Sequence, residues 1–382
     1  MIKYVNRRDS NALKFSGVKT RFNTTRDDIV PMWLADMEFA PPQCAVNAVQ
    51  QFASLHTGYQ SQHYHSLVVA WYKKMGMVVQ RNAVVPFAGL ILAYNTVLAH
   101  LVNSSPRIVC LCPDYGPLQN IARQHSANVC GLPVMCSGAG WHFDVNAIHP
   151  NTDAVVFSHP HNPTGELWHT DLLSHLAEHC ARHNILIICD EAHAGLTAQL
   201  HYNSMYTHSV QAGARAVVLG SINKAFNLAA INAGSFAVTT LAEDANRLND
   251  VANALHLSPS ALSEYVFNAV VNSEQSFAWL ESVNARIASN KAMVSHALAG
   301  FLYYVQILPT GATYFLWLNF TGLPYRGRSL QHELCDVAGI AMNCGEEFGA
   351  PGFARMNVAM HPDTIDVACT RLRQWLSEYS VI

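Results

Sequence analysis

Lys224 is the first residue whose type and setting could support covalent chemistry. It lies in VVLGSINKAFNLAA, residues 217–230, which contains no other charged residue. Between residues 192 and 242 the only other charge, histidines aside, is Arg215. A lysine in an apolar setting is unfavourable unless it pairs with an anion, gives up its proton or bonds covalently to a carbonyl group.

Other groups with chemical potential follow apolar runs elsewhere in the chain. Asp190 follows ILIIC, where a carboxylate needs a cationic partner or strong hydrogen-bond donors. Asn162 lies in the turn sequence NPTG, and Tyr115 lies in PDYGP, where its flat ring could stack on a flat ligand. Residues 89–91 should open a helix, whose unused N–H groups suit a phosphate. Together these groups match pyridoxal 5'-phosphate (PLP), which proteins hold through a lysine and an acidic partner of the ring nitrogen.

Short apolar runs alternate with helix-like stretches in the middle of the chain. We expect strands in PRIVCLCPDYG, DAVVFSHPHNPTGE, ILIICDEAH and ARAVVLGS, with a helix in LLSHLAEHCARHN between the second and the third. Continuous apolar strands that alternate with helices indicate an α/β fold, with a mainly parallel sheet covered by helices on both faces. Ligands of such sheets bind beyond the carboxyl ends of the strands, so the polar residues there should gather at one edge.

The pattern changes beyond about residue 242. It becomes mostly helical and then includes two short strand-like runs, ATYFLWLNF and GFARMNVAM. We therefore expect a large PLP-binding domain at 41–278 and a smaller α+β domain at 279–382. The loop-rich segment 1–40 should pack with the small domain.

The composition argues against several classes of protein. The net charge is −3, and no basic face of the kind that nucleic-acid binders need is visible. The ten cysteines include no Cys-x-x-Cys pair, which is typical of a reduced, cytoplasmic protein. The apolar stretch 84–102 contains Pro86, Gly89, Asn95 and His100, so it predicts a strand, a turn and a buried helix rather than a membrane span.

A competing metal motif occurs at 175–179, where HLAEH matches the H-x-x-E-H zinc pattern. It falls in the helix expected between two buried strands, away from the carboxyl edge of the sheet, and no third ligand stands out. Five-residue patterns also arise easily in a chain with twenty histidines. We therefore expect no metal site.

The motifs NPTG, DEAH and SINKAFN, in this order, resemble those of the fold-type I, PLP-dependent class I/II aminotransferase-like family. Within that family the chain is most similar to the cystathionine β-lyase branch (cysteine-S-conjugate β-lyases). This resemblance starts at NRRDSNALKF and DIVPMWLADMEFAPP, passes through Gly58-Tyr59 and ends at GFARMNVAM and HPDTID. NPTG alone is a weak signal, whereas the ordered set is specific.

The resemblance implies a role for each matching residue around the cofactor ring. Lys224 would bond to the cofactor and then shuttle the substrate proton, and Asp190 would pair with the ring nitrogen. Asn162 would hydrogen-bond the ring hydroxyl, and Tyr115 would stack on or flank the ring. His193, in DEAH, would lie near the ring.

The resemblance also implies contacts with the cofactor phosphate. Leu90 and Ile91 would donate backbone N–H groups at the helix that Gly89 opens, and Ser221 would add its side chain. Tyr59 would reach the phosphate of the neighbouring subunit, which implies a homodimer.

Two positions depart from the family pattern. Asn223 stands where a small hydroxyl residue often precedes the lysine. Asn232 lies eight residues past Lys224, where many aminotransferases carry a phosphate-binding arginine. The lyase branch commonly lacks that arginine too, so this departure favours a lyase.

The activity implied by the resemblance is that of a PLP-dependent carbon–sulfur β-lyase, which releases a thiol, pyruvate and ammonia from L-cystathionine or related cysteine S-conjugates. Arg355, in GFAR, would bind the carboxylate of this small-molecule amino-acid substrate, because its planar guanidinium suits a bidentate contact. An aminotransferase of an L-amino acid needs the same lysine, aspartate, asparagine and arginine, so the residues leave both activities open. A PLP-binding regulatory protein with little turnover is a third possibility.

Overall fold

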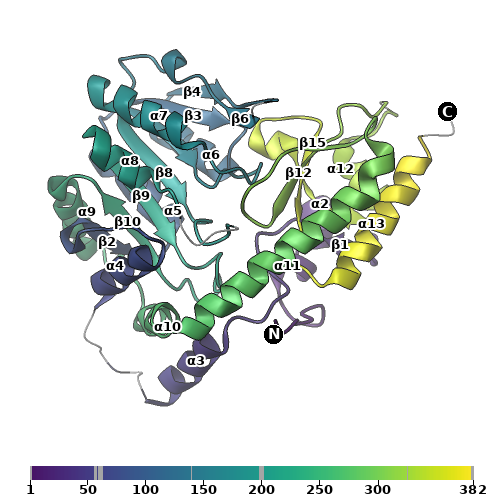
Figure 1. Cartoon of the computed structure of the whole chain (residues 1–382), viewed down its shortest axis with the longest axis horizontal. Coiled ribbons are helices and arrows are strands. Elements are labelled where there is room, and N and C mark those ends of the chain that lie inside the picture. Colours follow the sequence, from purple (N-terminus) through teal and green to yellow (C-terminus); the bar gives the residue numbers. More distant parts are fainter. Residues whose placement is uncertain are drawn as a thin grey trace. The chain divides into compact units, whose positions relative to one another are not determined.

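The computed structural model in Figure 1 contains two compact units. It describes residues 2–55, 58, 63–138, 140–197, 202–324 and 326–379. Unit 1 comprises residues 1–40, 163–165 and 281–382, and unit 2 comprises residues 41–162 and 166–280.

Unit 2 is built on a seven-stranded sheet with the strand order β2-β10-β9-β8-β7-β3-β4. The strands are β2 (Val84–Phe87), β3 (Arg107–Cys112), β4 (Asn128–Pro133), β7 (Ala154–Ser158), β8 (Leu186–Glu191), β9 (Ala216–Ser221) and β10 (Ser235–Thr239). The five strands from β9 to β4 run parallel, whereas β10 runs antiparallel to both of its neighbours. The predicted mainly parallel α/β sheet is therefore confirmed.

The helices of unit 2 are α3 (Gln43–Leu55), α4 (Tyr64–Lys74), α5 (Leu90–Leu101), α6 (Gly116–His125), α7 (Thr170–His183), α8 (Met205–Ala212), α9 (Ala242–Ala254) and α10 (Ala261–Val271).

Burial on both faces explains why the central strands are continuously apolar. Val156 in β7, Ile188 in β8 and Leu219 in β9 join one core cluster with α5, α6 and α9. Val155 and Ile187 are also fully buried, and they face the other side because side chains alternate along a strand. There, α7 packs against β8 and α8 packs against β9.

The apolar stretch 84–102 forms strand β2, a turn at Ala88-Gly89 and helix α5, as predicted. Within the described ranges, no helix is both long and apolar enough to cross a membrane. A small antiparallel hairpin, β5 (Met135–Ser137) and β6 (Gly140–His142), lies outside the main sheet.

Unit 1 contains a four-stranded antiparallel sheet with the order β11-β12-β15-β14. Its strands are β11 (Gln306–Ile307), β12 (Phe315–Asn319), β14 (Asn343–Cys344) and β15 (Phe353–Asn357), and β1 (Val30–Pro31) pairs in parallel with β13 (Ile340–Ala341). The helices are α1 (Leu13–Ser16), α2 (Val18–Phe22), α12 (Leu330–His332) and α13 (Pro362–Ser377), while α11 (Glu274–Leu298) begins in unit 2 and ends in unit 1. Unit 1 also contains short 3₁₀ turns at Ala299–Phe301 and Gly345–Phe348 and a π-helical turn at Glu333–Val337. The 3₁₀ turns at Arg81–Ala83 and Val145–Ala147 belong to unit 2.

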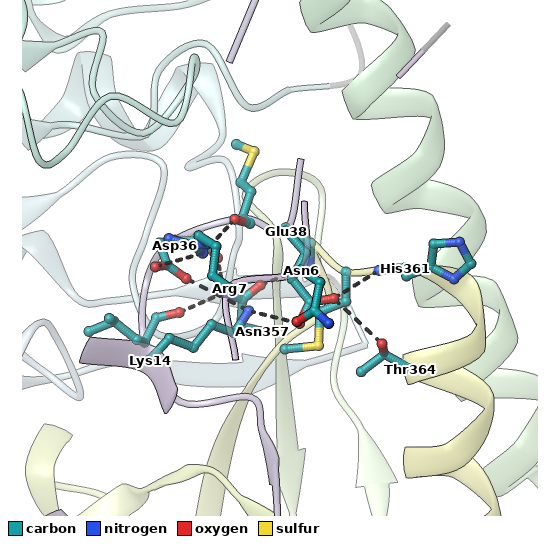
Figure 2. Close-up of polar contacts among 12 residues, drawn as sticks. Asn6, Arg7, Lys14, Asp36, Glu38, Asn357, His361 and Thr364 are labelled. Atoms are coloured by element: carbon teal, nitrogen blue, oxygen red, sulfur yellow. Dashed lines mark hydrogen bonds and ion pairs between the residues drawn. The ribbon is translucent and has the colours of Figure 1, made fainter. Parts of the chain in front are cut away.

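Buried charges tie the N-terminal segment to the rest of unit 1 (Figure 2). The fully buried Lys14 places its Nζ 3.7 Å from Asp36 Oδ1 and 3.7 Å from Glu38 Oε1. Arg7 donates to Asp36 Oδ2 at 3.0 Å, and Glu38 Oε2 accepts the backbone N–H of His361 at 3.2 Å. His361 precedes α13, so this charge cluster joins chain segments more than 300 residues apart.

Candidate functional site

The carboxyl ends of β7, β8 and β9 meet at one edge of the unit 2 sheet, because these strands are parallel and in register. Ser158, the last residue of β7, pairs with Asp190 of β8, and Asp190 pairs with Leu219 of β9. Ser221 ends β9, and Lys224 lies in the turn directly after it. The sheet therefore brings Asp190, Ser221 and Lys224 to neighbouring strand ends, as the sequence predicted.

Asp190 carries a perturbed carboxyl group next to a positive charge. Burial raises the pKa of Asp190 to about 6, while a hydrogen bond from the backbone N–H of Ala192 and the charge of Lys224 both lower it. Asp190 Oδ1 accepts that N–H at 2.9 Å, which is the local capping contact that a turn aspartate commonly makes. Asp190 also interacts electrostatically with the charge of Lys224, and a capping role alone does not account for this second interaction.

Asp114 organises the ends of β3 and β7. Its buried carboxylate accepts three hydrogen bonds: from the Ser158 hydroxyl at 2.6 Å, from the Ser158 backbone N–H at 3.0 Å and from the Tyr115 backbone N–H at 2.6 Å. Ser158 Oγ in turn accepts the backbone N–H of Asn162 at 2.9 Å. Asp114 thus fixes the backbone at both Tyr115 and Asn162, the residues predicted to contact the cofactor ring.

Asp114 lies at the end of the expected strand PRIVCLCPDYG, and no role is assigned to it from the sequence. The available signal was a carboxylate directly after the apolar strand RIVCLC, since such a group needs several donors when it is buried. Burial raises the pKa of Asp114 to about 7 in spite of the hydrogen bonds that it accepts.

Two buried histidines near this edge make structural contacts. His159 Nε2 lies 3.0 Å from the Asn203 carbonyl, and His161 Nε2 lies 3.0 Å from the Pro113 carbonyl. Burial lowers the pKa of His159 to about 4 and that of His161 to about 3. Both rings are therefore neutral near pH 7.

The first turn of α5 offers backbone donors beside the end of β2. Gly89 is the N-cap residue, the helix begins at Leu90, and no described side chain caps this end. The first N–H groups of a helix have no partner within it, so those at Leu90 and Ile91 suit an anion. The N–H of Ala88 is held by the Leu257 carbonyl at 2.8 Å, which fixes the turn before the helix.

Ser221 lies close to this helix end through the strand pairing. Ser235 of β10 pairs with Ser221 of β9 on one side and with Phe87 of β2 on the other. Ser221 Oγ accepts the backbone N–H of Asn223 at 3.0 Å, which leaves its own hydroxyl hydrogen to donate. Two of the predicted phosphate contacts, α5 and Ser221, therefore follow strands separated only by β10.

His193 is buried in the turn after β8, where its carbonyl accepts the Leu196 N–H at 2.8 Å. Tyr59 lies outside the described residues. His179, in the zinc-like motif, directs Nε2 to the Ile148 carbonyl at 3.0 Å. No group of three or more potential metal ligands is positioned to hold a metal ion in the part of the chain that the structure describes.

Arg355 belongs to unit 1 and lies in β15. It is buried, and its guanidinium carbon lies 4.0 Å from the ring centre of Phe315 and 5.0 Å from that of Phe348. Arg355 also donates to the Trp33 carbonyl at 3.1 Å. Packing against two rings and one backbone contact hold the guanidinium in a fixed plane.

The groups gathered in unit 2 fit PLP. The α5 end supplies uncapped donors for a phosphate, and Lys224 supplies an amine that can bond to an aldehyde. Asp190 is a desolvated carboxylate, which a cationic ring nitrogen would stabilise. Each of these features is needed by a different part of the same cofactor.

Comparisons with known proteins agree with this chemistry. A family model described as "Aminotransferase class I and II" matches residues 30–372. The chain is 22% identical over 366 residues to cystathionine beta-lyase PatB of Bacillus subtilis (strain 168), covering 92% of this chain and 93% of PatB.

Solved structures show the same fold at low identity. Cystalysin from Treponema denticola, which contains PLP, has a TM-score of 0.90 at 19% identity, covering 98% of both chains. The PLP-bound C-S lyase from Staphylococcus hominis has a TM-score of 0.86 at 20% identity, covering 98% of this chain and 97% of that chain. With the family model spanning nearly the whole sequence, the chain belongs to the PLP-binding aminotransferase class I and II family.

Proposed function

We propose that this protein is a PLP-dependent carbon–sulfur β-lyase that acts on L-cystathionine or related cysteine S-conjugates. The products are a thiol, pyruvate and ammonia. The observation that supports a lyase most directly is the similarity to a cystathionine β-lyase across 92% of the chain. The placement of Lys224 near Asp190 supports PLP chemistry in general.

Bound PLP supplies an electron sink for the charge that develops at the substrate Cα when its proton leaves. In our proposal the Lys224 amine removes that proton as a general base, and the Asp190 carboxylate keeps the ring nitrogen protonated. Asn162 would donate to the ring hydroxyl, and Tyr115 would stack on or flank the ring. His193 lies near the ring.

The phosphate and the substrate use a second set of residues in this proposal. Leu90 and Ile91, at the helix end opened by Gly89, bind the phosphate through backbone N–H groups, and Ser221 adds its hydroxyl. Arg355 binds the substrate carboxylate. Tyr59 of the partner subunit completes the phosphate site in a homodimer, so dissociation of the dimer should weaken PLP binding.

The second candidate is an aminotransferase, which the description of the family favours. It would use Lys224, Asp190, Asn162 and Arg355 in the same way up to proton removal. It differs in keeping the bond to the leaving group and in requiring a 2-oxo acid as amino acceptor. The presence or absence of that requirement separates the two activities.

The deciding experiment incubates the holoenzyme with L-cystathionine and no 2-oxo acid, and measures pyruvate and thiol. Stoichiometric release of both supports the lyase. Product formation that begins only after a 2-oxo acid is added overturns the lyase in favour of the aminotransferase. Lys224→Ala is the matched control, because it should remain folded and release neither product. Normal thiol release by this variant would contradict the role of Lys224.

A further inference from the structure

Asn232 joins three segments that border the proposed phosphate site. Its side-chain amide nitrogen donates to the Ala88 carbonyl, in the turn before α5. Its side-chain oxygen accepts hydrogen bonds from Asn223 Nδ2 at 2.9 Å and from Ser235 Oγ at 3.1 Å. One side chain therefore connects the ends of β2 and β9 and the start of β10.

The contact with Ala88 controls the direction of a neighbouring donor. A trans peptide is planar, so fixing the Ala88 carbonyl also fixes the N–H of Gly89, which points the opposite way. The N–H of Ala88 is already held by Leu257. Asn232 thus orients the peptide that leads directly into the uncapped helix end at Leu90.

The identity of residue 89 is explained by the same contact. Gly89 has an extended backbone, with φ of −178°, that any residue adopts, so its conformation does not demand glycine. A Cβ at Gly89 would lie 3.0 Å from Asn232 Nδ2, which is tighter than ordinary packing. Glycine therefore allows the amide to approach the turn.

The backbone of Asn232 also suits this role. Its φ of 54° is in the left-handed region, which asparagine adopts more readily than most residues other than glycine. Asn223, its hydrogen-bond partner, immediately precedes Lys224. The two positions that depart from the family pattern are thus a single interacting pair, which also links the lysine turn to the phosphate turn.

We propose that Asn232 is a positioning residue for the cofactor phosphate. It acts by fixing the backbone donors at the start of α5 rather than by placing a charge on the phosphate. The proposal rests on the phosphate site described under the proposed function. It does not depend on whether the enzyme is a lyase or an aminotransferase.

The test compares the binding of PLP and of pyridoxal to the apoprotein by titration. Both ligands carry the same aldehyde, so a change confined to PLP reports on the phosphate. Asn232→Gly removes the amide and keeps the left-handed backbone, so this variant isolates the contact. Asn232→Asp replaces the donor by an acceptor of the same shape and also adds a negative charge that would repel the phosphate. We expect each variant to raise the Kd of PLP roughly 10- to 100-fold and to change that of pyridoxal less than about 3-fold.

Ser263→Ala is the matched control. Ser263 Oγ donates to the backbone carbonyl of Asn232 at 2.9 Å, so the change removes a neighbouring hydrogen bond and keeps the side-chain contact with Ala88. We expect its PLP affinity to stay within about 2-fold of wild type. A loss equal to that of the Asn232 variants would overturn the proposal, because any disturbance of the loop would then have the same effect.

Two other results would also overturn it: PLP affinity unchanged in the Asn232 variants, or PLP and pyridoxal weakened equally. A wild-type protein that binds PLP no more tightly than pyridoxal would refute the proposed phosphate site itself.

If the Asn232 variants fail to fold, Gly89→Ala disturbs the same contact from the other side. Selective loss of PLP affinity in Gly89→Ala would support the proposal, and its absence would overturn it.

Discussion

The positive charge of Lys224 lowers the pKa of the Asp190 carboxyl, but burial outweighs it and raises that pKa to about 6. Asp190 lies near the end of β8, and Lys224 follows the neighbouring parallel strand β9, at the carboxyl edge of the sheet. In the apoprotein, ionised Asp190 is therefore less stable than an exposed aspartate. A cationic ring nitrogen would remove this disadvantage.

Asp190→Asn should change how the stability of the apoprotein depends on pH. The folded-state pKa of about 6 lies above the ordinary aspartate value of 3.8, so the folded state binds more protons between these values. The wild type should lose stability relative to Asp190→Asn as the pH rises through this window, by at most about 3 kcal/mol. Urea unfolding of both apoproteins from pH 4 to 7.5 measures the difference. A constant difference across the window would contradict the raised pKa.

Arg355→Ala should weaken substrate binding in particular. Loss of a charge-assisted hydrogen bond is worth about 1.5–3 kcal/mol, so KM should rise about 10- to 100-fold. Arg355→Lys should restore only part of the loss, because lysine lacks the planar fork that packs against Phe315 and Phe348. Steady-state kinetics with the PLP-saturated enzyme provide the measurement. An unchanged KM in Arg355→Ala would remove its proposed role.

Lys14→Met should destabilise unit 1. It leaves the Asp36 and Glu38 carboxylates without the buried ammonium group that lies 3.7 Å from each (Figure 2), at a cost of about 3 kcal/mol. The surface pair of Lys19 and Asp27 gives a matched control, because both side chains are mostly exposed. Lys19→Met should change the free energy of unfolding by less than about 1 kcal/mol. Equal effects of the two changes in denaturant unfolding would disprove the prediction.

The effect of Lys14 should also depend on pH. Burial lowers the pKa of Lys14 below its ordinary 10.5, so the unfolded state binds more protons between the two values. The wild type should therefore gain stability relative to Lys14→Met as the pH rises towards 10.5. Unfolding curves at several alkaline pH values test this, and a gap that narrows over the same range would show that the sign is wrong.

Gly165→Ala should destabilise the turn of the NPTG motif. Gly165 has a φ of +73°, and an added Cβ would press against Thr310 Oγ1 and lie 2.9 Å from the Ala312 carbonyl. Left-handed strain and overpacking together should cost about 2–4 kcal/mol. Gly213, with a φ of +68° and open space around it, isolates the backbone strain, so Gly213→Ala should cost only about 1–2 kcal/mol. Thermal or urea unfolding of both variants compares them, and equal losses would exclude the packing explanation.

The sequence alone identified the features that depend on nearby residues. The runs ILIIC and AVVLG predict strands buried on both faces, and the isolated charge of Lys224 makes it a candidate for ion pairing, deprotonation or covalent chemistry. Less regular elements were not singled out. In β4, Gly131 and Pro133 interrupt the apolar residues and are unfavourable in a strand, and β10 is a short antiparallel strand of five residues.

Only the tertiary structure decided which of these residues meet. Asn232 was visible as a missing arginine, but its contact with Ala88 joins positions 144 residues apart. Asp114 holds Ser158 across 44 residues, and Arg355 contacts Trp33 across 322. Periodicity and turn chemistry are local, so they fix where strands and helices form. The partners of a buried polar side chain depend on strand order and register, which arise only when distant segments pack together.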